Sequence, residues 1–314
     1  MLVLIIGITG NVGSKLIHPL IQHGAQVRGL ARHKSKLAPE KVEALESFHE
    51  MEAWYDVPAI KKALKGVDAV ICAYGPVPEL VLDAQLLLVR LMEEEGITRF
   101  VPSAWNLDWS ILSWGDIVYY DLFLAFQRQL AMSSRIKPMY IFIGFFAETF
   151  FSLAGHGVFN PSTHGVWDSG SVAAGEAAPR AEFWGTGDEK WQITTEQDTA
   201  DFTARLITDR SKEDGGVYRY CSWEYSIKEI AEIYEKERGV GVKLERLGSL
   251  EDLMVTAQKS QRELGLGRFW EWMGYTYQIH QLGGKMMMKT LDDGLYLDLK
   301  RTKLEDFLRE HQEI

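Results

Sequence analysis

The chain has little of what builds disulfide frameworks, metal sites or membrane spans. Only two of its 314 residues are cysteines, Cys72 and Cys221, and their positions show no pairing pattern, which is typical of a reducing compartment. Its eight histidines form no His-Glu-x-x-His motif and no cluster with cysteine, so we expect no metal site. The most apolar stretch, residues 140–154, contains Glu148 and is too short to cross the ~30 Å hydrocarbon core of a bilayer.

Positive charge is also scarce. Lys and Arg total 34 against 44 Asp and Glu, a net charge of −10 without a basic patch, so we expect no nucleic-acid partner. The apolar residues Met1–Ile6 follow no basic segment and indicate a strand, not a signal peptide. The sequence therefore favours a cytoplasmic protein. A hydrophobic content of 46% excludes general disorder.

The first 150 residues alternate between short apolar runs and segments with helical spacing of apolar residues. This alternation predicts an α/β fold with a doubly wound parallel sheet. The expected strands are residues 2–6, 26–31, 42–48, 69–73, 99–102 and 139–143. The expected helices are residues 12–23, 59–64, 78–94 and 119–133.

The regular alternation of expected strands and helices ends in the second half of the chain. Residues 155–190 are rich in glycine and indicate loops and short strands. Further on we expect helices at 198–208, 226–237 and 250–262, and strands at 217–221 and 242–246. The sequence thus predicts a dinucleotide-binding domain, 1–153, and a smaller substrate-binding lobe or lid, 154–314, part of which could return to the sheet. Ligands of open α/β folds bind at the carboxyl edge of the sheet, where this lobe would lie.

A glycine-rich turn follows the first strand. Such a turn lets backbone amides approach a pyrophosphate, which the N-terminus of the next helix also attracts. The alternative is a purely structural turn, but its place between a strand and a helix favours a nucleotide and a Rossmann-type fold. The residues concerned are Gly7, Thr9, Gly10, Asn11, Val12 and Gly13.

The end of the second strand indicates which nucleotide binds. Sites for NAD place a carboxylate there to bind the ribose hydroxyls. This chain has instead a cationic segment, residues 32–36, that includes Arg32 and Lys36. Cations suit the 2′-phosphate of NADP, although a solvated charged loop would have the same composition. We predict NADP(H) as the cofactor.

Four segments of the sequence resemble one family. GITGNVG, ARHKSK, AIKKALKGVDAVICAYG and FVPSAWN are similar to the NmrA-like and isoflavone-reductase-like proteins, atypical short-chain dehydrogenases. The resemblance implies that Tyr74, Gly75, Ser103 and Ala104, which end the fourth and fifth strands, flank the nicotinamide. The family includes reductases of phenylpropanoids and fungal natural products, and also dinucleotide-binding regulators without turnover.

The chain departs from the family's reductases at one position. Those enzymes usually carry a lysine on the helix after the fifth strand, whereas this chain has none between Lys65 and Lys137. A neutral carbonyl would be poorly activated without it. An iminium carbon is already electrophilic, and we predict Tyr120, Asp121 and Asp108 as the groups that deliver a proton and stabilise charge.

Aromatic residues are dense between residues 103 and 151. Many would belong to the core, but those in the loop after the fifth strand are placed to line a large apolar pocket. The predicted substrate-binding residues are Trp105, Trp109, Trp114, Phe145 and Phe146. With carboxylates nearby, such a pocket suits a polycyclic aromatic or cationic, alkaloid-like ligand.

Two functions follow from these observations. The first is an NADPH-dependent oxidoreductase of specialised metabolism, of the fungal natural-product kind, that reduces an imine or iminium or promotes a cyclisation. The alternative is a catalytically silent NADP(H) sensor that binds a protein partner. The aromatic pocket favours the enzyme and the missing lysine favours the sensor.

Overall fold

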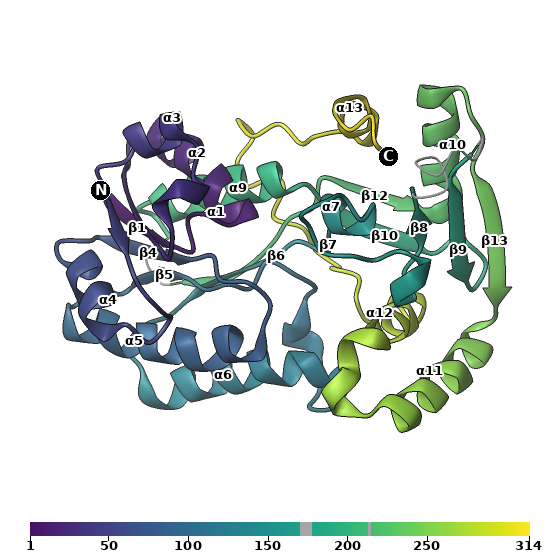
Figure 1. Ribbon diagram of the computed structural model, residues 1–314, viewed down its shortest axis with the longest axis horizontal. Coiled ribbons are helices and arrows are strands. Elements are labelled where there is room, and N and C mark those ends of the chain that lie inside the picture. The colour runs from purple at the N-terminus through teal and green to yellow at the C-terminus, as the bar shows by residue number, and fades with distance from the viewer. Residues whose placement is uncertain (170–177, 213–214) are drawn as a thin grey trace.

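A parallel sheet forms the centre of the first half of the molecule (Figure 1). The computed structural model describes residues 1–169, 178–212 and 215–314. The sheet has the order β3-β2-β1-β4-β5, the order of dinucleotide-binding folds. Its strands are β1 (Leu2–Ile6), β2 (Gln26–Ala31), β3 (Ser47–Glu50), β4 (Ala69–Cys72) and β5 (Arg99–Val101). β6 (Met139–Phe142) follows β5 through a bridge from Asn106 to Phe142, and β11 (Gly216–Arg219) pairs with β6 in parallel.

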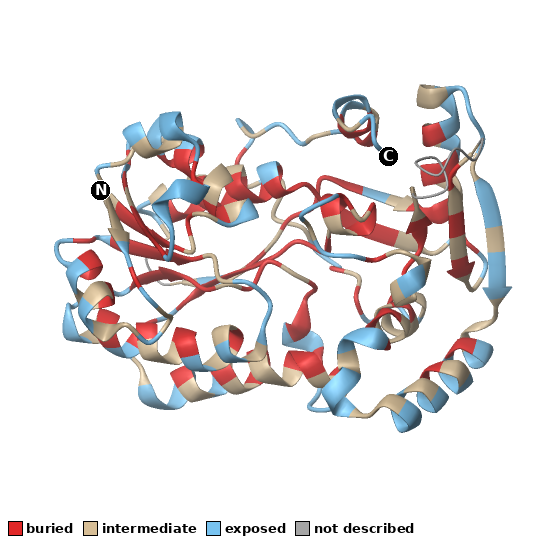
Figure 2. Ribbon diagram, viewed as in Figure 1, coloured by how far each residue is buried: buried red, intermediate tan, exposed pale blue. Residues whose placement is uncertain are grey.

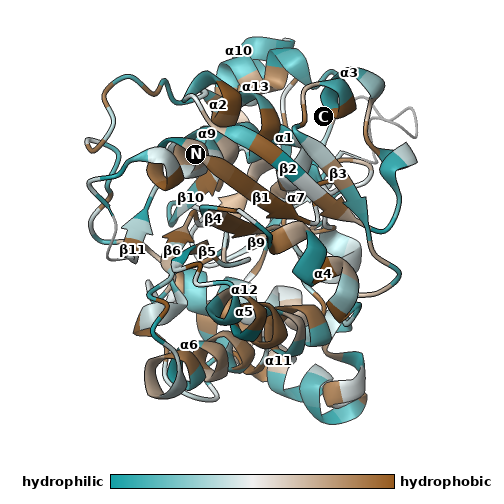
Figure 3. Cartoon of the chain, turned by 90° about the vertical axis from the view of Figure 1, so that its left-hand side faces the viewer, coloured by the Kyte–Doolittle hydropathy of each residue, from teal (hydrophilic) through white to brown (hydrophobic). Residues whose placement is uncertain are grey.

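Helices cover both faces of this sheet (Figure 1). One face carries α4 (Val57–Leu64), α5 (Gln85–Glu94) and α6 (Asp121–Ser133). The other carries α1 (Asn11–Lys15), α2 (Ile17–Gln22) and α9 (Glu196–Thr208). Alternate residues of β1 enter two separate apolar cores, Leu4 and Ile6 on one side and Val3 and Ile5 on the other. Burial on both faces explains why this strand is a continuous apolar run, as Figures 2 and 3 show.

The second half of the chain builds a lobe beside the sheet (Figure 1). One small sheet has the order β12-β10-β7 and another the order β13-β9-β8. Their strands are β7 (Phe145–Phe146), β8 (Trp167–Asp168), β9 (Arg180–Trp184), β10 (Lys190–Thr194), β12 (Trp223–Ser226) and β13 (Lys243–Gly248). The helices are α7 (Ala147–Phe150), α10 (Ile227–Arg238), α11 (Leu250–Leu264), α12 (Met273–Leu282) and α13 (Leu304–Glu310). Figure 2 shows that β13 and α11 form an exposed outer rim of this lobe.

The α/β fold with its parallel sheet is confirmed, and three local predictions need correction. The strand expected at 42–48 begins only at Ser47, because α3 (Pro39–Glu43) occupies the preceding residues and Pro39 at its first position favours a helix start. The helix expected at 12–23 is divided into α1 and α2 at Leu16. Pro19, which lacks an N–H, limits the continuity of this helix. The strand expected at 217–221 ends at Arg219.

Two parts of the C-terminal half return to the sheet. α9 packs on α1 and α2, and β11 extends the strand order beyond β6. The domain boundary at 153/154 remains a prediction, but the sheet and its covering helices contain residues from both sides of that boundary. Of the predicted loop segment 155–190, residues 170–177 lie outside the described part of the chain. No helix in the described ranges has both the length and the apolar composition needed to cross a membrane.

Candidate functional site

The glycine turn between β1 and α1 is too tightly packed for side chains at two of its positions. Gly7 has φ +79°, and a Cβ there would lie 2.4 Å from the carbonyl oxygen of Ala73. A Cβ on Gly13 would lie 2.4 Å from the carbonyl oxygen of Gly7. Gly10 differs, because its Cβ would approach protein atoms only to 3.3 Å. Gly10 instead lines two cavities, so a side chain there would enter the space a ligand needs.

The smaller of these cavities, of about 530 Å³, lies between the glycine turn and the end of β2. Gly7, Thr9 and Gly10 line one side, and the exposed Arg32 and Lys36 line the other. The glycine turn and the cations therefore line one space, and their binding of a dinucleotide stays a prediction. Trp54 also lines this cavity, which the sequence analysis missed. Its place after β3 was obscured by the wrong limits predicted for that strand.

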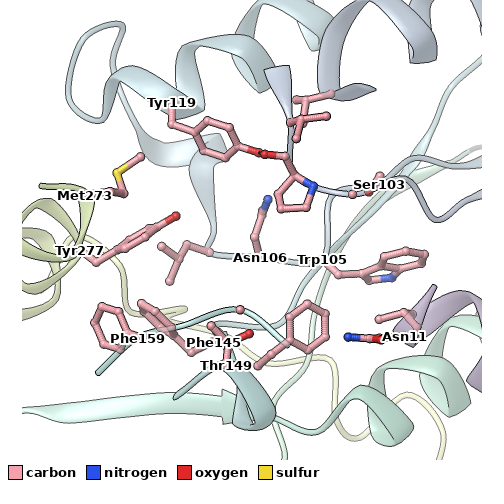
Figure 4. Close-up of a pocket in the computed structure, with 18 of the residues that line it drawn as sticks. Asn11, Ser103, Trp105, Asn106, Tyr119, Phe145, Thr149, Phe159, Met273 and Tyr277 are labelled. Carbon is pink, nitrogen blue, oxygen red and sulfur yellow. The ribbon is translucent and has the colours of Figure 1, made fainter. Parts of the chain in front are cut away.

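The larger cavity, of about 700 Å³, shares part of its lining with the first, and Figure 4 shows side chains around it. Gly10, Tyr74 and Gly75 belong to both linings. Asn11, Val12 and Ser103 line the larger cavity, whereas Ala104 is buried outside its lining and Gly13 packs beneath the turn. The hydroxyl of Ser103 donates to the carbonyl oxygen of Tyr74 over 2.8 Å. This bond joins the ends of β4 and β5 where the two cavities meet.

Aromatic and aliphatic side chains from both halves of the chain form the walls of the larger cavity. Three of the predicted substrate residues, Trp105, Phe145 and Phe146, belong to this lining. Residues that the sequence analysis did not assign to a site include Leu107, Phe123, Phe159, Met273 and Tyr277. The last two lie on α12, more than 150 residues from Trp105. No local pattern in the sequence shows that this helix closes the cavity.

Trp109 and Trp114 do not line the cavity, which corrects the prediction for them. The 3₁₀ turn Trp109–Ile111, capped by Asp108, directs Trp109 into the core. There its ring packs at 5.7 Å from Phe123 and 5.1 Å from Phe142. Trp114 is 60% exposed, at 5.9 Å from the guanidinium of Arg128.

The two candidate carboxylates also lie outside the cavity lining. Asp108 is buried, and its Oδ2 is 2.6 Å from Nε of Arg219. Asp121 begins α6 and accepts the backbone N–H of Gly115 over 2.8 Å. Both acids are therefore bound by a local cation or amide outside the cavity, which does not fit the proton-delivery and charge-stabilising roles predicted for them. Tyr120 does line the cavity, and burial raises its pKa well above the usual range.

A strap of residues 153–159 crosses from the lobe to the glycine turn. Asn11 Nδ2 lies 3.2 Å from the carbonyl oxygen of Gly155 and 3.0 Å from Nδ1 of His156. The same Nδ1 is 2.7 Å from Glu196 Oε1, and Lys15 Nζ is 2.9 Å from Glu196 Oε2. Because a carboxylate only accepts, Nδ1 must carry the proton it shares with Glu196, which leaves the Asn11 amide to donate to Gly155. Glu196, at the start of α9, thus connects the turn, the strap and the cavity wall.

Comparison with known proteins identifies the family. The model of the NmrA-like family matches residues 1–290. The chain belongs to the NmrA-like family. A bifunctional pinoresinol-lariciresinol reductase of Linum usitatissimum is 25% identical, over 98% of this chain and 97% of that protein.

Two solved structures are similar to this NmrA-like protein. The complex of AtPrR2 with NADP+ and (+)pinoresinol superposes with a TM-score of 0.72 at 20% identity, over 98% of this chain and 97% of that one. The complex of a Vitis vinifera leucoanthocyanidin reductase with NADPH also gives 0.72, at 20% identity and 99% of both chains. At these identities the structures establish the fold.

Glu148 makes the stability of this NmrA-like protein depend on pH. Its carboxyl accepts the backbone N–H of Glu196 at 3.0 and 3.1 Å. Burial, and then the charge of Glu196, raise its pKa from the usual 4.5 to about 7. The folded protein therefore holds this proton more tightly than the unfolded chain, and stability from this group is complete below pH 4.5 and lost as the pH rises through 7.

We expect Glu148→Gln to flatten this dependence, because a glutamine oxygen can accept the same N–H without ionising. Urea unfolding at pH 5 and pH 8 measures the effect. The wild type should lose on the order of 2 kcal/mol more than the variant over this interval. Glu43→Gln, a change at an exposed residue of α3, is the control and should retain the wild-type slope. An identical slope for Glu148→Gln would contradict the assignment.

Proposed function

We propose that this protein is an NADPH-dependent reductase of a bulky aromatic substrate. The observation that carries the proposal is the continuity of the two cavities through Gly10, Tyr74 and Gly75. A basic space beside the glycine turn leads directly into an aromatic cavity of about 700 Å³, large enough for a ligand of several rings. The names of its relatives, reductases of pinoresinol and lariciresinol, support the same conclusion.

The residues present fit a dinucleotide phosphate. Gly10 leaves the space that a pyrophosphate needs, and Arg32 and Lys36 offer cations to a 2′-phosphate at the far end of the smaller cavity. Ser103, Tyr74 and Gly75, at the ends of β5 and β4, lie where the two cavities join and would flank the nicotinamide. When bound, NADPH supplies the hydride of the reduction. The protein's part is to orient both ligands and to exclude water.

The cavity favours a neutral aromatic substrate over a cationic one. Its lining is mainly apolar, and its carboxylate among the described residues is Glu196, which is already engaged by Lys15 and His156. No lysine is among the described residues of this lining, which supports a narrower proposal. The acceptor would be an imine or enone carbon of specialised, for example fungal, metabolism, whose nitrogen or oxygen takes a proton as the carbon is reduced.

Consumption of NADPH, followed by its absorbance at 340 nm, tests this function. Pinoresinol, an aryl enone and a cyclic aryl imine are the acceptors, with a simple ketone as control. We expect turnover of at least one aromatic acceptor and little of the ketone. Tight NADPH binding without consumption in any of these reactions would instead favour the silent sensor, whose protein partner could then be sought.

Cofactor preference gives a second test. We expect NADPH to bind at least tenfold more tightly than NADH, a difference of ~1.4 kcal/mol. Arg32→Ala with Lys36→Ala should remove this preference by weakening NADPH alone, measured by calorimetry. Lys34→Ala is the matched control in the same loop, because Lys34 is not among the residues that line the cavity. Equal affinity of the wild type for both dinucleotides would refute the NADP assignment.

A further inference from the structure

Most polar groups around the larger cavity already have protein partners. The hydroxyl of Tyr119 donates to the carbonyl oxygen of Pro76 over 2.9 Å. That of Ser103 donates to the carbonyl oxygen of Tyr74, and Glu196 is held by Lys15 and His156. These groups shape the cavity but have little left to offer a ligand. Tyr277 of α12 differs, and in Figure 4 its hydroxyl points from the helix into the space between the walls.

Tyr120 lies beside Tyr277 in the cavity wall. Both residues belong to the lining, and their rings meet edge to face with centroids 6.3 Å apart. The Tyr120 hydroxyl lowers the pKa of Tyr277, as expected of a neighbour that donates toward its oxygen. The proton of Tyr277 is then left for a group in the cavity.

The surroundings of Tyr277 hold this hydroxyl in place. Its ring makes edge contacts with Phe145 at 5.3 Å and Phe159 at 6.2 Å. α12 is docked closely, since a Cβ on Gly274 would lie 2.1 Å from the carbonyl oxygen of Thr163. Gln278, one residue further along, donates to the carbonyl oxygen of His164 over 2.8 Å. A hydroxyl fixed in this way meets the first condition for proton transfer, which is position.

We propose that Tyr277 is the proton donor of this site and that Tyr120 is its positioning residue. The inference rests on the proposed reductase function. The acceptor carbon receives the hydride of NADPH, the π electron pair of the C=N or C=C–C=O group moves to its nitrogen or oxygen, and that atom takes the proton from Tyr277 Oη. The tyrosinate, beside the Tyr120 hydroxyl, regains a proton from water when the product leaves.

The protonation state of Tyr277 fits this role. Burial raises its pKa to about 12, while the hydrogen bond from Tyr120 acts in the opposite direction. The phenol is thus fully protonated at neutral pH and can act as an acid. Because the Tyr120 hydroxyl lowers the pKa of Tyr277, loss of that hydroxyl should make Tyr277 a weaker acid, while the Tyr277 side chain still lines the cavity.

Tyr277→Phe and Tyr275→Phe form a matched pair. Both residues lie on α12, but Tyr275 stacks on His164 at 3.9 Å and is not among the residues that line the cavity. The first readout needs no turnover and is the affinity for 2-naphthol, an aromatic probe whose oxygen can accept a hydrogen bond, measured by calorimetry with NADP+ present. We expect Tyr277→Phe to weaken it about tenfold, as for one lost hydrogen bond, and Tyr275→Phe to leave it unchanged. NADPH affinity should not change in either variant.

The second readout is turnover of whichever acceptor the wild type reduces. Tyr277→Phe should lower kcat by about 10²–10³-fold, and Tyr120→Phe by about tenfold, with the alkaline limb of the kcat profile shifted upward. If the wild type reduces none of the acceptors but the probe still distinguishes Tyr277→Phe, the reductase function fails while the donor stands as a binding group. Unchanged naphthol affinity in Tyr277→Phe overturns the proposal in either case.

Discussion

Gly13→Val should abolish dinucleotide binding and strongly destabilise the protein. The new Cβ would lie 2.4 Å from the carbonyl oxygen of Gly7 and 3.0 Å from Cα of Ile8. Both are backbone atoms and cannot move aside, so α1 would separate from β1 at a cost of ~3 kcal/mol or more. Urea unfolding and NADPH fluorescence measure the two losses. Gly66→Ala is the control, since a Cβ there meets nothing within 4 Å and costs only ~1–2 kcal/mol for its positive φ.

Gly10→Val separates binding from stability at the same turn. A Cβ on Gly10 approaches the oxygen of Gly7 to 3.3 Å, which a small shift relieves. The valine would nevertheless enter both cavities. We expect a stability loss of ~1 kcal/mol but more than a hundredfold loss of NADPH affinity. Normal NADPH binding by either turn variant would show that the dinucleotide binds elsewhere.

Arg99→Met is expected to produce the largest loss of stability away from the site. Arg99 is only 9% exposed, and its guanidinium donates to four backbone carbonyls at the end of α9. These are Ile207 at 2.6 Å, Asp209 at 2.6 Å, Lys212 at 3.0 Å and Leu206 at 3.1 Å. Methionine fills similar volume but removes all four hydrogen bonds. The carbonyls of Leu206 and Asp209 still accept a backbone N–H, whereas those of Ile207 and Lys212 lose the donor that Arg99 supplies, at a cost of ~3 kcal/mol.

Urea unfolding of three variants tests this prediction. Arg99→Lys should restore part of the stability, because an ammonium satisfies fewer carbonyls than the planar guanidinium. Arg90→Met is the control, since Arg90 is an exposed residue of α5 that bonds Ser133 and should contribute no more than ~0.5 kcal/mol. Comparable losses for Arg90→Met and Arg99→Met would refute the role given to burial.

The sheet, and the residues that line the smaller cavity, could be predicted because their signals are local. A buried strand is an apolar run, and the turn Gly7–Gly13 needs glycine for reasons contained within a few residues and one neighbouring strand. The cations Arg32 and Lys36 follow β2 directly and line the expected cavity. The limits of β3 were wrongly predicted because Pro39, which favours the start of a helix, begins α3 just before that strand.

The substrate end could not be predicted in the same way. The loop of residues 103–118 has no periodicity, and its 3₁₀ turn decides that Trp105 reaches the cavity while Trp109 does not. The carboxylate of Asp108 accepts the backbone N–H of Ser110, two residues further along. This is a common role of Asp in turns, and the sequence pattern could have suggested it. Tyr277 and Glu196 reach the cavity from α12 and α9, and only tertiary packing brings these helices there.

The return of α9 and β11 to the sheet has a consequence for synthesis of the protein. β6 ends at Phe142, whereas its neighbour β11 ends at Arg219. Arg99 can form all four of its hydrogen bonds only after Lys212 has been synthesised. A ribosome adds ~5–20 residues per second, so roughly 4–15 s separate the emergence of the two strands. During that interval one face of the sheet has α1 and α2 but lacks α9, and the nascent chain exposes an apolar surface to which chaperones bind. We therefore expect the parallel sheet of the first half to complete its folding only after the part of the lobe up to β11 has been made.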